Sequence, residues 1–325
     1  MKRTALLNGG AFLATLALAA ALAPGRTRLP VVTAATAPAP ASQRVRLPDG
    51  SFALPDTTGY PVPLRPYRRI VSTSIVTDRL LVSLCEPDRI LAFSNAGVHE
   101  SPWAYQYAGK ASVEGLGALE PLISLKPDLV LMSRFGGPGR VGKLRAAGIE
   151  VFDLGELHGL SSLLPIARST GELLGHPDRA AELMTTFQRR WKAVASSLGN
   201  RPRRTALYVA AIGPTLIGGT TGTSYHDVLE AAGLVDVAAG RFKDWPQYSA
   251  EQIMSMSPEL LVTKEGMGNA LCIYPGLERL TACAPGHVVE LPSGMIEDPG
   301  LTMLETAERL FDLAYGQAAA PARGP

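Results

Sequence analysis

Short apolar runs alternate with stretches of helical periodicity along most of the chain. The runs that read as buried strands in the first half occupy residues 69–73, 89–93, 128–133 and 150–154. Helical sequence separates them, notably over 78–84 and through the 140s. Strands alternating with helices are typical of parallel α/β architecture, so the pattern predicts an N-terminal α/β lobe over residues 66–159.

From Leu160 to about Leu198 the pattern is helical throughout. The sequence Gly175-His176-Pro177-Asp178 divides this segment into a shorter and a longer helix, because proline is well tolerated at a helix start. Beyond it, strand-like runs return at 205–210, 215–219, 259–264 and 287–291, with helices expected at 225–232 and 301–315. The pattern therefore predicts a bridging helical segment over 160–199 and a C-terminal α/β lobe over 200–316.

Two parts of the chain repeat each other. The stretch Glu120–Leu131 reads EPLISLKPDLVL, and the stretch Glu251–Val262 reads EQIMSMSPELLV. Their glutamates and prolines are offset by the same amount, 251 − 120 = 258 − 127 = 131. A duplicated unit predicts two similar lobes, and ligand pockets favour the cleft between such lobes.

The N-terminal segment has the pattern of an export signal. Lys2 and Arg3 precede an apolar run from Ala11 to Ala23 that is too short to cross a membrane comfortably. We expect residues 1–23 to direct export, with cleavage and an uncleaved anchor both open. No cysteine follows the run, so lipoprotein processing is not expected. Residues 24–65, rich in Pro, Ala and Thr, are predicted to form a flexible tether, and 317–325 a disordered tail.

Composition narrows the class of protein. The 325 residues, 46% hydrophobic and 18% charged, suffice for two domains. The net charge of +2 falls to 2 − 2 = 0 without Lys2 and Arg3, so no nucleic-acid partner is indicated. Three cysteines allow at most one intramolecular disulfide. Cys272 and Cys283 are the candidate pair, two free thiols being the alternative, and Cys85 is left over.

Several motifs, in order along the chain, resemble one known family. Arg69-Ile70-Val71-Ser72 opens the first lobe, Glu120–Val130 contains Glu-x6-Pro-Asp-Leu-Val, its echo starts at Glu251, and Asp227–Leu234 reads DVLEAAGL. These residues resemble the periplasmic substrate-binding proteins of ABC importers for ferric siderophores, haem and cobalamin. The resemblance covers about residues 60–315. It implies an exported, monomeric binding protein with two α/β lobes bridged by one long rigid helix.

The resemblance also implies a protein partner. In the family, one exposed glutamate on each lobe forms salt bridges to arginines of the ABC transporter permease dimer, and the matching positions are Glu120 and Glu251. Ser249 precedes Glu251 with capping-box spacing, which places Glu251 in a first helical turn where the helix dipole favours a carboxylate. Stabilisation of the helix end alone is the alternative for each glutamate.

Ligand contacts are expected from loops at the carboxyl ends of parallel strands. Aromatic rings there suit a macrocycle or catecholate, and an arginine suits an anionic chelate. A lone Trp or Tyr is more often core, which is the alternative for each aromatic candidate. The candidates are Ser74, Trp103, Tyr105, Arg134, Phe135, Tyr225 and Trp245.

The identity of the ligand is open between a few metal chelates. The segment Trp245–Glu251 is similar to one in cobalamin-binding members, where a tryptophan contacts the corrin. Those members carry another tryptophan where this chain has Ser133, and Arg134 suits an anionic ferric siderophore. Haem-binding members place a tyrosine ligand where this chain has Val113. We expect cobalamin or a ferric siderophore, with haem third, and no intrinsic cofactor or metal.

Other chemistries have weaker support in the sequence. A bare Zn²⁺ or Mn²⁺ site would need the five histidines to converge, yet they are scattered without His-x-His or His-x3-His spacing. Gly218–Thr223 is glycine-rich but lacks the lysine of a P-loop, and no Gly-x-Ser-x-Gly elbow occurs, so an enzyme is not expected. An adhesion or signalling module on the same fold is the remaining alternative.

Overall fold

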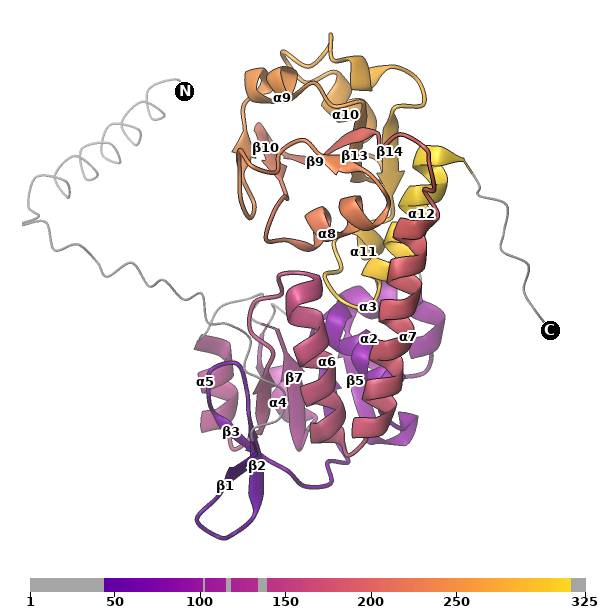
Figure 1. Ribbon diagram of the computed structural model, residues 1–325. Helices are drawn as coiled ribbons and strands as arrows, with labels where there is room; N and C mark the ends of the chain where they lie inside the picture. Colours follow the sequence, from indigo (N-terminus) through magenta and orange to yellow (C-terminus); the bar gives the residue numbers. More distant parts are fainter. Residues whose placement is uncertain (1–43, 102, 115–117, 134–138, 317–325) are drawn as a thin grey trace, which may run out of the picture. The chain divides into compact units, whose positions relative to one another are not determined.

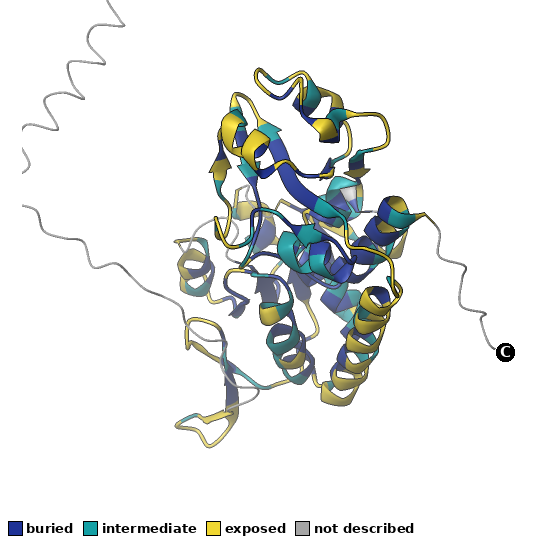
Figure 2. Ribbon diagram, turned by 45° about the horizontal axis from the view of Figure 1, so that its top comes forward, coloured by how far each residue is buried: buried dark blue, intermediate teal, exposed yellow. Residues whose placement is uncertain are grey.

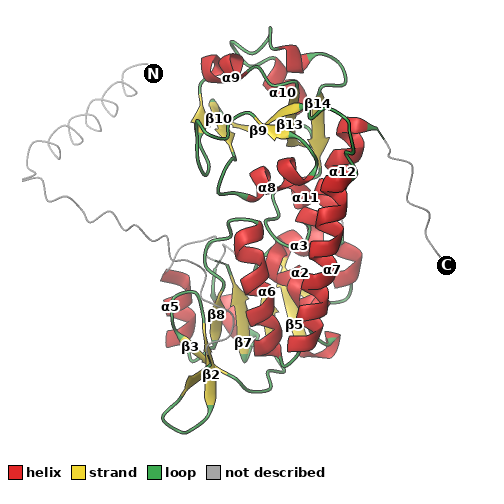
Figure 3. Ribbon diagram, in the orientation of Figure 1, coloured by secondary structure: helices red, strands yellow, loops and turns green. Residues whose placement is uncertain are grey.

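The computed structural model describes residues 44–101, 103–114, 118–133 and 139–316 (Figure 1). The predicted export signal, residues 24–43 of the predicted tether and the predicted C-terminal tail lie outside these residues. None of the helices in the described ranges has the length and apolar character needed to cross a membrane. The described chain forms two α/β lobes and a small antiparallel sheet, with helices flanking both larger sheets (Figure 3).

The N-terminal lobe is built on a five-stranded sheet in the order β6-β5-β4-β7-β8, and all neighbouring strands are parallel. Its strands are β4 (Ile70–Ser72), β5 (Ile90–Ser94), β6 (Ala111–Val113), β7 (Leu129–Met132) and β8 (Val151–Asp153). Its helices are α2 (Ile75–Leu84), α3 (Asn95–Glu100), α4 (Glu120–Ser124) and α5 (Gly139–Ala146), with short 3₁₀ turns η1 (Pro87–Arg89) and η2 (Ala104–Tyr107). The central strands are buried, as in a sheet covered on both faces (Figure 2). The predicted parallel lobe is confirmed.

The C-terminal lobe contains a mixed sheet in the order β12-β10-β9-β13-β14, with β11 also paired to β9. Its strands are β9 (Thr205–Ile212), β10 (Thr215–Gly218), β11 (Val235–Asp236), β12 (Gln247–Tyr248), β13 (Leu260–Lys264) and β14 (Val288–Leu291). The strands β11, β9, β13 and β14 are parallel. Strand β10 is antiparallel to β9, because only Gly213 and Pro214 connect them and so short a link permits only a hairpin.

The sequence repeat corresponds to the same arrangement in both lobes. In the N-terminal lobe α4 leads into β7, which lies between β4 and β8. In the C-terminal lobe α9 (Ala250–Met256) leads into β13, which lies between β9 and β14. Helix α10 (Gly268–Cys272) then takes the place of α5. The remaining helices of this lobe are α8 (Ser224–Ala231), α11 (Ser293–Ile296), α12 (Met303–Tyr315) and the 3₁₀ turn η3 (Thr281–Cys283).

Two helices join the lobes, as the sequence predicts. Helix α6 (Leu160–Leu174) packs along α7 (Pro177–Ser196), and α7 contacts α2 of the N-terminal lobe as well as α8 and α12 of the C-terminal lobe. The buried face of α7 presents Ala180, Met184, Phe187 and Val194. One continuous apolar core therefore extends through both lobes and the bridging segment.

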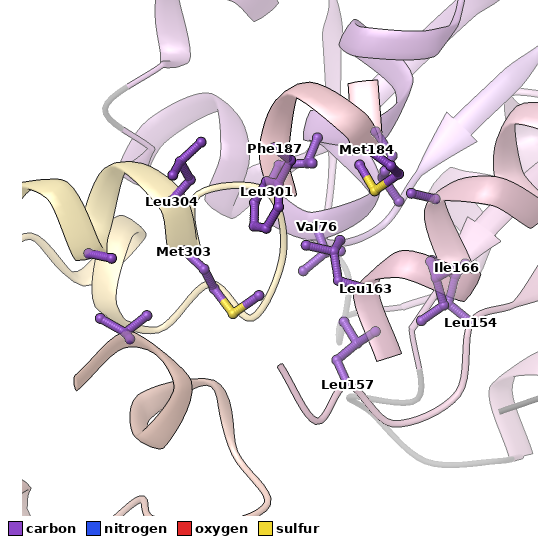
Figure 4. Close-up of a cluster of buried hydrophobic side chains, with 14 of the residues drawn as sticks. Val76, Leu154, Leu157, Leu163, Ile166, Met184, Phe187, Leu301, Met303 and Leu304 are labelled. Atoms are coloured by element: carbon purple, nitrogen blue, oxygen red, sulfur yellow. The ribbon is translucent and has the colours of Figure 1, made fainter. Parts of the chain in front are cut away.

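The chain returns to the N-terminal lobe just before its last helix. Val76, Phe187 and Leu301 are 3%, 3% and 5% exposed and meet in a buried cluster drawn from α2, α7 and the segment just before α12 (Figure 4). The approach is so close that a Cβ on Gly300 would lie 3.0 Å from a Val76 methyl group. We call this region, with the neighbouring Asp78 and Asp298, the lobe junction.

The tether predicted up to residue 65 is wrong for residues 44–65. They include a three-stranded antiparallel sheet of β1 (Val45–Arg46), β2 (Phe52–Pro55) and β3 (Pro61–Pro63). Leu54 and Val62 are buried, and Asp56 forms an ion pair of 2.5 Å with Arg145 of α5. Strands this short lack a core of their own, and docking on the N-terminal lobe supplies the buried surface.

The predicted cysteine pairing is confirmed. Cys272 and Cys283, 11 residues apart in sequence, form a disulfide that links α10 to η3 in the C-terminal lobe. Cys85 is free and buried, and burial raises the pKa of its thiol to about 11. The leftover thiol is therefore protonated and shielded from solvent.

Candidate functional site

The repeated glutamates lie at equivalent positions on the two lobes. Glu120 is the first residue of α4 and Glu251 the second residue of α9, and both are exposed. The capping box predicted for α9 is present, since the Ser249 hydroxyl accepts from the Gln252 amide and the Gln252 side chain accepts from the Ser249 amide. The Ser249 hydroxyl lowers the pKa of Glu251, which keeps this carboxylate charged. Docking of a partner on these glutamates stays a prediction.

Trp245 lies where loops of the two lobes meet. It follows β11 in the C-terminal lobe, is 43% exposed, and its ring lies 5.8 Å from the His158 ring, centroid to centroid. His158 lies between β8 and α6 and also contacts the Gly222 carbonyl oxygen at 3.3 Å. We call His158, Gly222 and Trp245 the edge contact. Sequence analysis did not single out His158 as a ligand contact, because no linear spacing links it to Trp245.

A second link between the lobes lies beside the edge contact. The backbone amide of Leu160, at the start of α6, donates to Asp227 of α8 at 2.7 Å. A hollow of about 580 Å³ opens there, lined by Leu160, Ser161, Leu164, Pro165, Arg168 and Asp227. Burial raises the pKa of the Asp227 carboxyl above its ordinary value. The hollow thus has mainly apolar walls, and its lining includes one arginine and one carboxyl.

Tyr225 is held in place by its neighbours. Its ring stacks on Tyr208 of β9 with 3.7 Å between centroids, and a Cβ on Gly219 would lie 2.1 Å from the Tyr225 ring. Only glycine therefore fits at position 219. Burial raises the pKa of Tyr225 to about 12, so its phenol is neutral at physiological pH.

Two of the first-lobe candidates, Ser74 and Trp103, have partners in the described structure. Ser74 caps α2 and accepts from the Thr77 amide. The Arg79 guanidinium lies over the Trp103 ring at 4.4 Å, while Tyr105 is 72% exposed. Trp103 is thus paired near the lobe junction and Trp245 at the edge contact. The structure therefore distributes these aromatic candidates over two places. Arg134 and Phe135 lie outside the described residues.

Two buried carboxyls that the sequence did not reveal lie at the lobe junction. Asp78 of α2 accepts from the Ser94 amide at 3.0 Å and from the Ser94 hydroxyl at 2.5 Å. Burial raises the pKa of Asp78 to about 7, and burial likewise raises that of Asp298 to about 6. A neighbouring negative charge adds to each of these two shifts. Asp298 raises the pKa of Asp78, and Glu305 raises the pKa of Asp298.

The histidines do not converge. His226 pairs with Asp236 at 2.8 Å, and His176 pairs with Glu86 at 2.9 Å, in different parts of the fold. Within the described ranges, no three His, Cys, Asp or Glu side chains gather in a way that would hold a metal ion. The alternative of a bare Zn²⁺ or Mn²⁺ receptor thus gains no support from these residues.

Two α/β lobes joined by a long helix, with loops of both lobes meeting beside an exposed tryptophan, define a two-lobed ligand-binding protein. Residues 70–294 match the family described as periplasmic binding protein, and the chain belongs to that family. Its members are substrate-binding proteins of ABC transporters. Membership implies an extracytoplasmic location.

Individual relatives extend this similarity. The vitamin B12-binding protein of Yersinia pestis (strain Pestoides F) is 25% identical over 224 residues, which are 66% of this chain and 78% of the relative. The crystal structure of heme binding protein HmuT aligns with a TM-score of 0.69 and 21% identity, covering 87% of this chain and 94% of that chain. A periplasmic heme-binding protein from Roseiflexus sp. RS-1 aligns with a TM-score of 0.68 and 18% identity over 76% of this chain and 98% of the other. At these identities, the solved structures show the shared fold alone.

Proposed function

We propose that the protein captures a metal chelate outside the cytoplasm and delivers it to the permease of an ABC importer. Cobalamin is the first candidate ligand and a ferric siderophore the second. The observation that carries the proposal is the half-exposed Trp245, placed where loops of both lobes meet. An indole face there suits a flat macrocycle, and the relatives named vitamin B12-binding proteins favour cobalamin among the chelates.

The mechanism follows from contacts on both lobes. A ligand that touches Trp245 on one side and the β8–α6 loop on the other stabilises the arrangement in which the lobes approach each other. The long helix α7, packed against both lobes, limits how far they separate. Export by residues 1–23 is part of the same proposal, and the intact mass of the exported protein will show whether they are removed.

A titration of the exported protein tests the proposed ligand class. Cyanocobalamin, ferrioxamine, haemin and Zn²⁺ would each be added while absorbance and tryptophan fluorescence are followed. We expect saturable, submicromolar binding of cobalamin or, failing that, of the ferric siderophore. Saturation by haemin alone would favour the haem-binding alternative, which the heme-binding structural neighbours support. Binding of Zn²⁺ alone would overturn the chelate proposal.

Charge reversal of the repeated glutamates tests delivery. The double variant Glu120→Arg/Glu251→Arg is expected to abolish uptake of the ligand in cells, because two permease arginines would face positive charge, while the affinity for ligand stays unchanged. Glu182→Arg, on the exposed face of α7, is the matched control. An equal loss of ligand affinity in the double variant would show that these glutamates serve the binding site or the fold.

A further inference from the structure

Arg79 of α2 links the two lobes at the lobe junction. Its side chain is 12% exposed, and its Nη2 lies 3.2 Å from Oε1 of Glu305 on α12. Its Nη1 donates to the Gln106 side chain at 3.3 Å, and its guanidinium carbon lies 4.4 Å from the centre of the Trp103 ring. One arginine thus connects the N-terminal lobe, an aromatic candidate for ligand contact and the last helix of the chain.

The hydrogen-bonding capacity of this group of side chains is only partly used. Arg79 Nε, Glu305 Oε2 and Asp298 Oδ2 are buried, and none of the three has a hydrogen-bond partner among the described residues. Buried polar atoms are normally paired, because an unpaired one has lost its hydration without compensation. The junction therefore holds one unused donor on a cation and one unused acceptor on each of two carboxyls.

Asp298 is the buried carboxyl that is free to change partners. Its Oδ1 accepts from the Gly300 amide at 2.8 Å, whereas Oδ2 is the unused acceptor. Burial raises the pKa of Asp298 to about 6; among the neighbouring charges, Arg79 lowers this pKa and Glu305 raises it. The carboxyl that gains or loses a proton is thus within electrostatic range of the cation with the unused donor.

The other titratable groups around Arg79 and Asp298 are held by partners, neutral or exposed. Both oxygens of Asp78 accept hydrogen bonds, and burial raises the pKa of Tyr107, so its phenol stays neutral. His99, at the end of α3, is exposed, and Glu297 is exposed and pairs with Lys264 at 3.2 Å. The charged residues of α7 are all exposed. Asp298 therefore remains as the group whose ionisation acts on Arg79.

We propose that the lobe junction is a pH-sensitive switch in which a proton on Asp298 sets the partners of Arg79. When Asp298 is neutral, Arg79 pairs across the lobes with Glu305. When the proton leaves for solvent, the charge on Oδ2 attracts the Nε–H group, because a hydrogen bond between two charged groups is stronger than one to a neutral carboxyl. The guanidinium then turns toward Asp298, and its contact with the Trp103 ring changes.

The switch connects pH to a candidate ligand contact. Trp103 lies under the Arg79 guanidinium, so a turn of that group alters the surface that the ring presents. An effect on ligand affinity rests on the proposed function. The switch itself is a property of the protein without ligand, and it is tested in that state.

Fluorine NMR of the exported, ligand-free protein labelled with fluorinated tryptophan tests the switch. The chain has three tryptophans, and loss of one resonance in Trp103→Phe assigns that residue. We expect the Trp103 resonance to shift between about pH 5 and 8 with a midpoint near pH 6, because the ring senses the position of the guanidinium. Trp191, which stacks on Phe187, is the internal reference. A Trp103 resonance that does not change with pH, or a shift matched by Trp191, would overturn the inference.

Three variants identify the group that titrates. Asp298→Asn retains the shape of the side chain and should abolish the shift. Glu305→Gln removes a negative neighbour of Asp298 and should move the midpoint to lower pH, which keeps the inference testable if the first variant does not fold. His99→Gln, the matched control, removes an exposed imidazole from the segment that precedes Trp103 and should keep both the shift and its midpoint.

The variants also define the results that contradict the switch. A transition that persists in Asp298→Asn, an unchanged midpoint in Glu305→Gln or a transition lost in His99→Gln would each assign the change to another group. Because no ligand is present, each of these results leaves the proposed function intact, and the ligand titration decides that function separately.

Discussion

The two lobes meet in two places of very different character. At the lobe junction, Val76, Phe187 and Leu301 are at most 5% exposed and belong to the continuous core. At the edge contact, Trp245 is 43% exposed and the contact consists of one long hydrogen bond and one tilted ring pair. Burial of apolar surface stabilises the first contact far more than one exposed polar contact stabilises the second.

The difference indicates where the molecule is fixed and where it can adjust. An exposed hydrogen bond and a ring contact together contribute about 1 to 2 kcal/mol, an amount that ligand binding readily exceeds. The junction needs several times more to separate, since each buried large side chain contributes about 1.5 to 3 kcal/mol. We therefore expect ligand-dependent movement at the edge contact around an unchanged lobe junction.

Phe187→Ala is expected to have the largest effect, on folding. Removing this buried ring leaves a cavity between α7 and its neighbours and should lower the free energy of unfolding by about 3 to 5 kcal/mol in urea denaturation. Leu313→Ala, at a 41% exposed position of α12, is the control and should change it by less than about 0.5 kcal/mol. Similar losses for both variants would mean that the junction is no more critical than the surface.

Taken for each buried carboxyl separately, the pH dependence of stability is expected to come next in size. The pKa of Asp78 is about 7 and that of Asp298 about 6 in the folded protein, against 3.8 for an ordinary aspartate, so the folded state binds more protons between these limits. Their stabilising contribution is complete below about pH 3.8 and is lost as the pH rises to about 7. At about 1.4 kcal/mol per unit of pKa, the two groups should lower the free energy of unfolding by roughly 2 to 4 kcal/mol each.

Neighbouring charges and a variant sharpen this expectation. Arg79 and Glu305, which pair at 3.2 Å, and the phenol of Tyr107 interact with these carboxyls, and Arg79 lowers the pKa of Asp298 while Glu305 raises it. Asp298→Asn keeps the acceptor for the Gly300 amide but cannot ionise. In urea denaturation between pH 5 and 8, the free energy of unfolding should therefore fall less steeply with rising pH for this variant than for the wild type. An identical slope would show that Asp298 does not contribute to the pH dependence of stability.

Trp245→Ala is expected to have the smallest effect on folding and a clear effect on binding. Because the ring is half exposed, the free energy of unfolding should change by less than about 1 kcal/mol, whereas the affinity for the chelate should fall about tenfold or more. Phe52→Ala, at a 48% exposed aromatic position of β2, is the matched control. Unchanged affinity in the Trp245 variant would remove that residue from the binding site.

The sequence predicted the features that depend on local pattern. The echo of Glu120–Leu131 at Glu251–Val262 fixes both helix–strand units, and Pro177 marks the start of α7. The strands of segment 44–65 were not predicted, because they are short. The structure of this segment also depends on contacts with distant residues, such as the hydrogen bond from the Thr57 hydroxyl to the Asp153 carbonyl oxygen, 96 residues away. The sequence periodicity around Thr57 and around Asp153 gives no indication of such a contact.

The candidate site was predicted less well for a related reason. Trp245 was identified by its neighbours in sequence, but its partner His158 comes from the other lobe. The environment of Asp78 is likewise assembled from Ser94 and the segment around Asp298, neither close in sequence. Contacts between distant segments decide which polar residues are paired, buried or free.

The state of the three cysteines makes the chain well suited to measuring lobe movement. Cys272 and Cys283 are joined, and Cys85 is 2% exposed with a protonated thiol. A maleimide dye should therefore not react with the three native cysteines and should label only cysteines introduced on the surface. Two such labels, one on each lobe, would report opening and closing by energy transfer between fluorophores without alteration of any native side chain in the core.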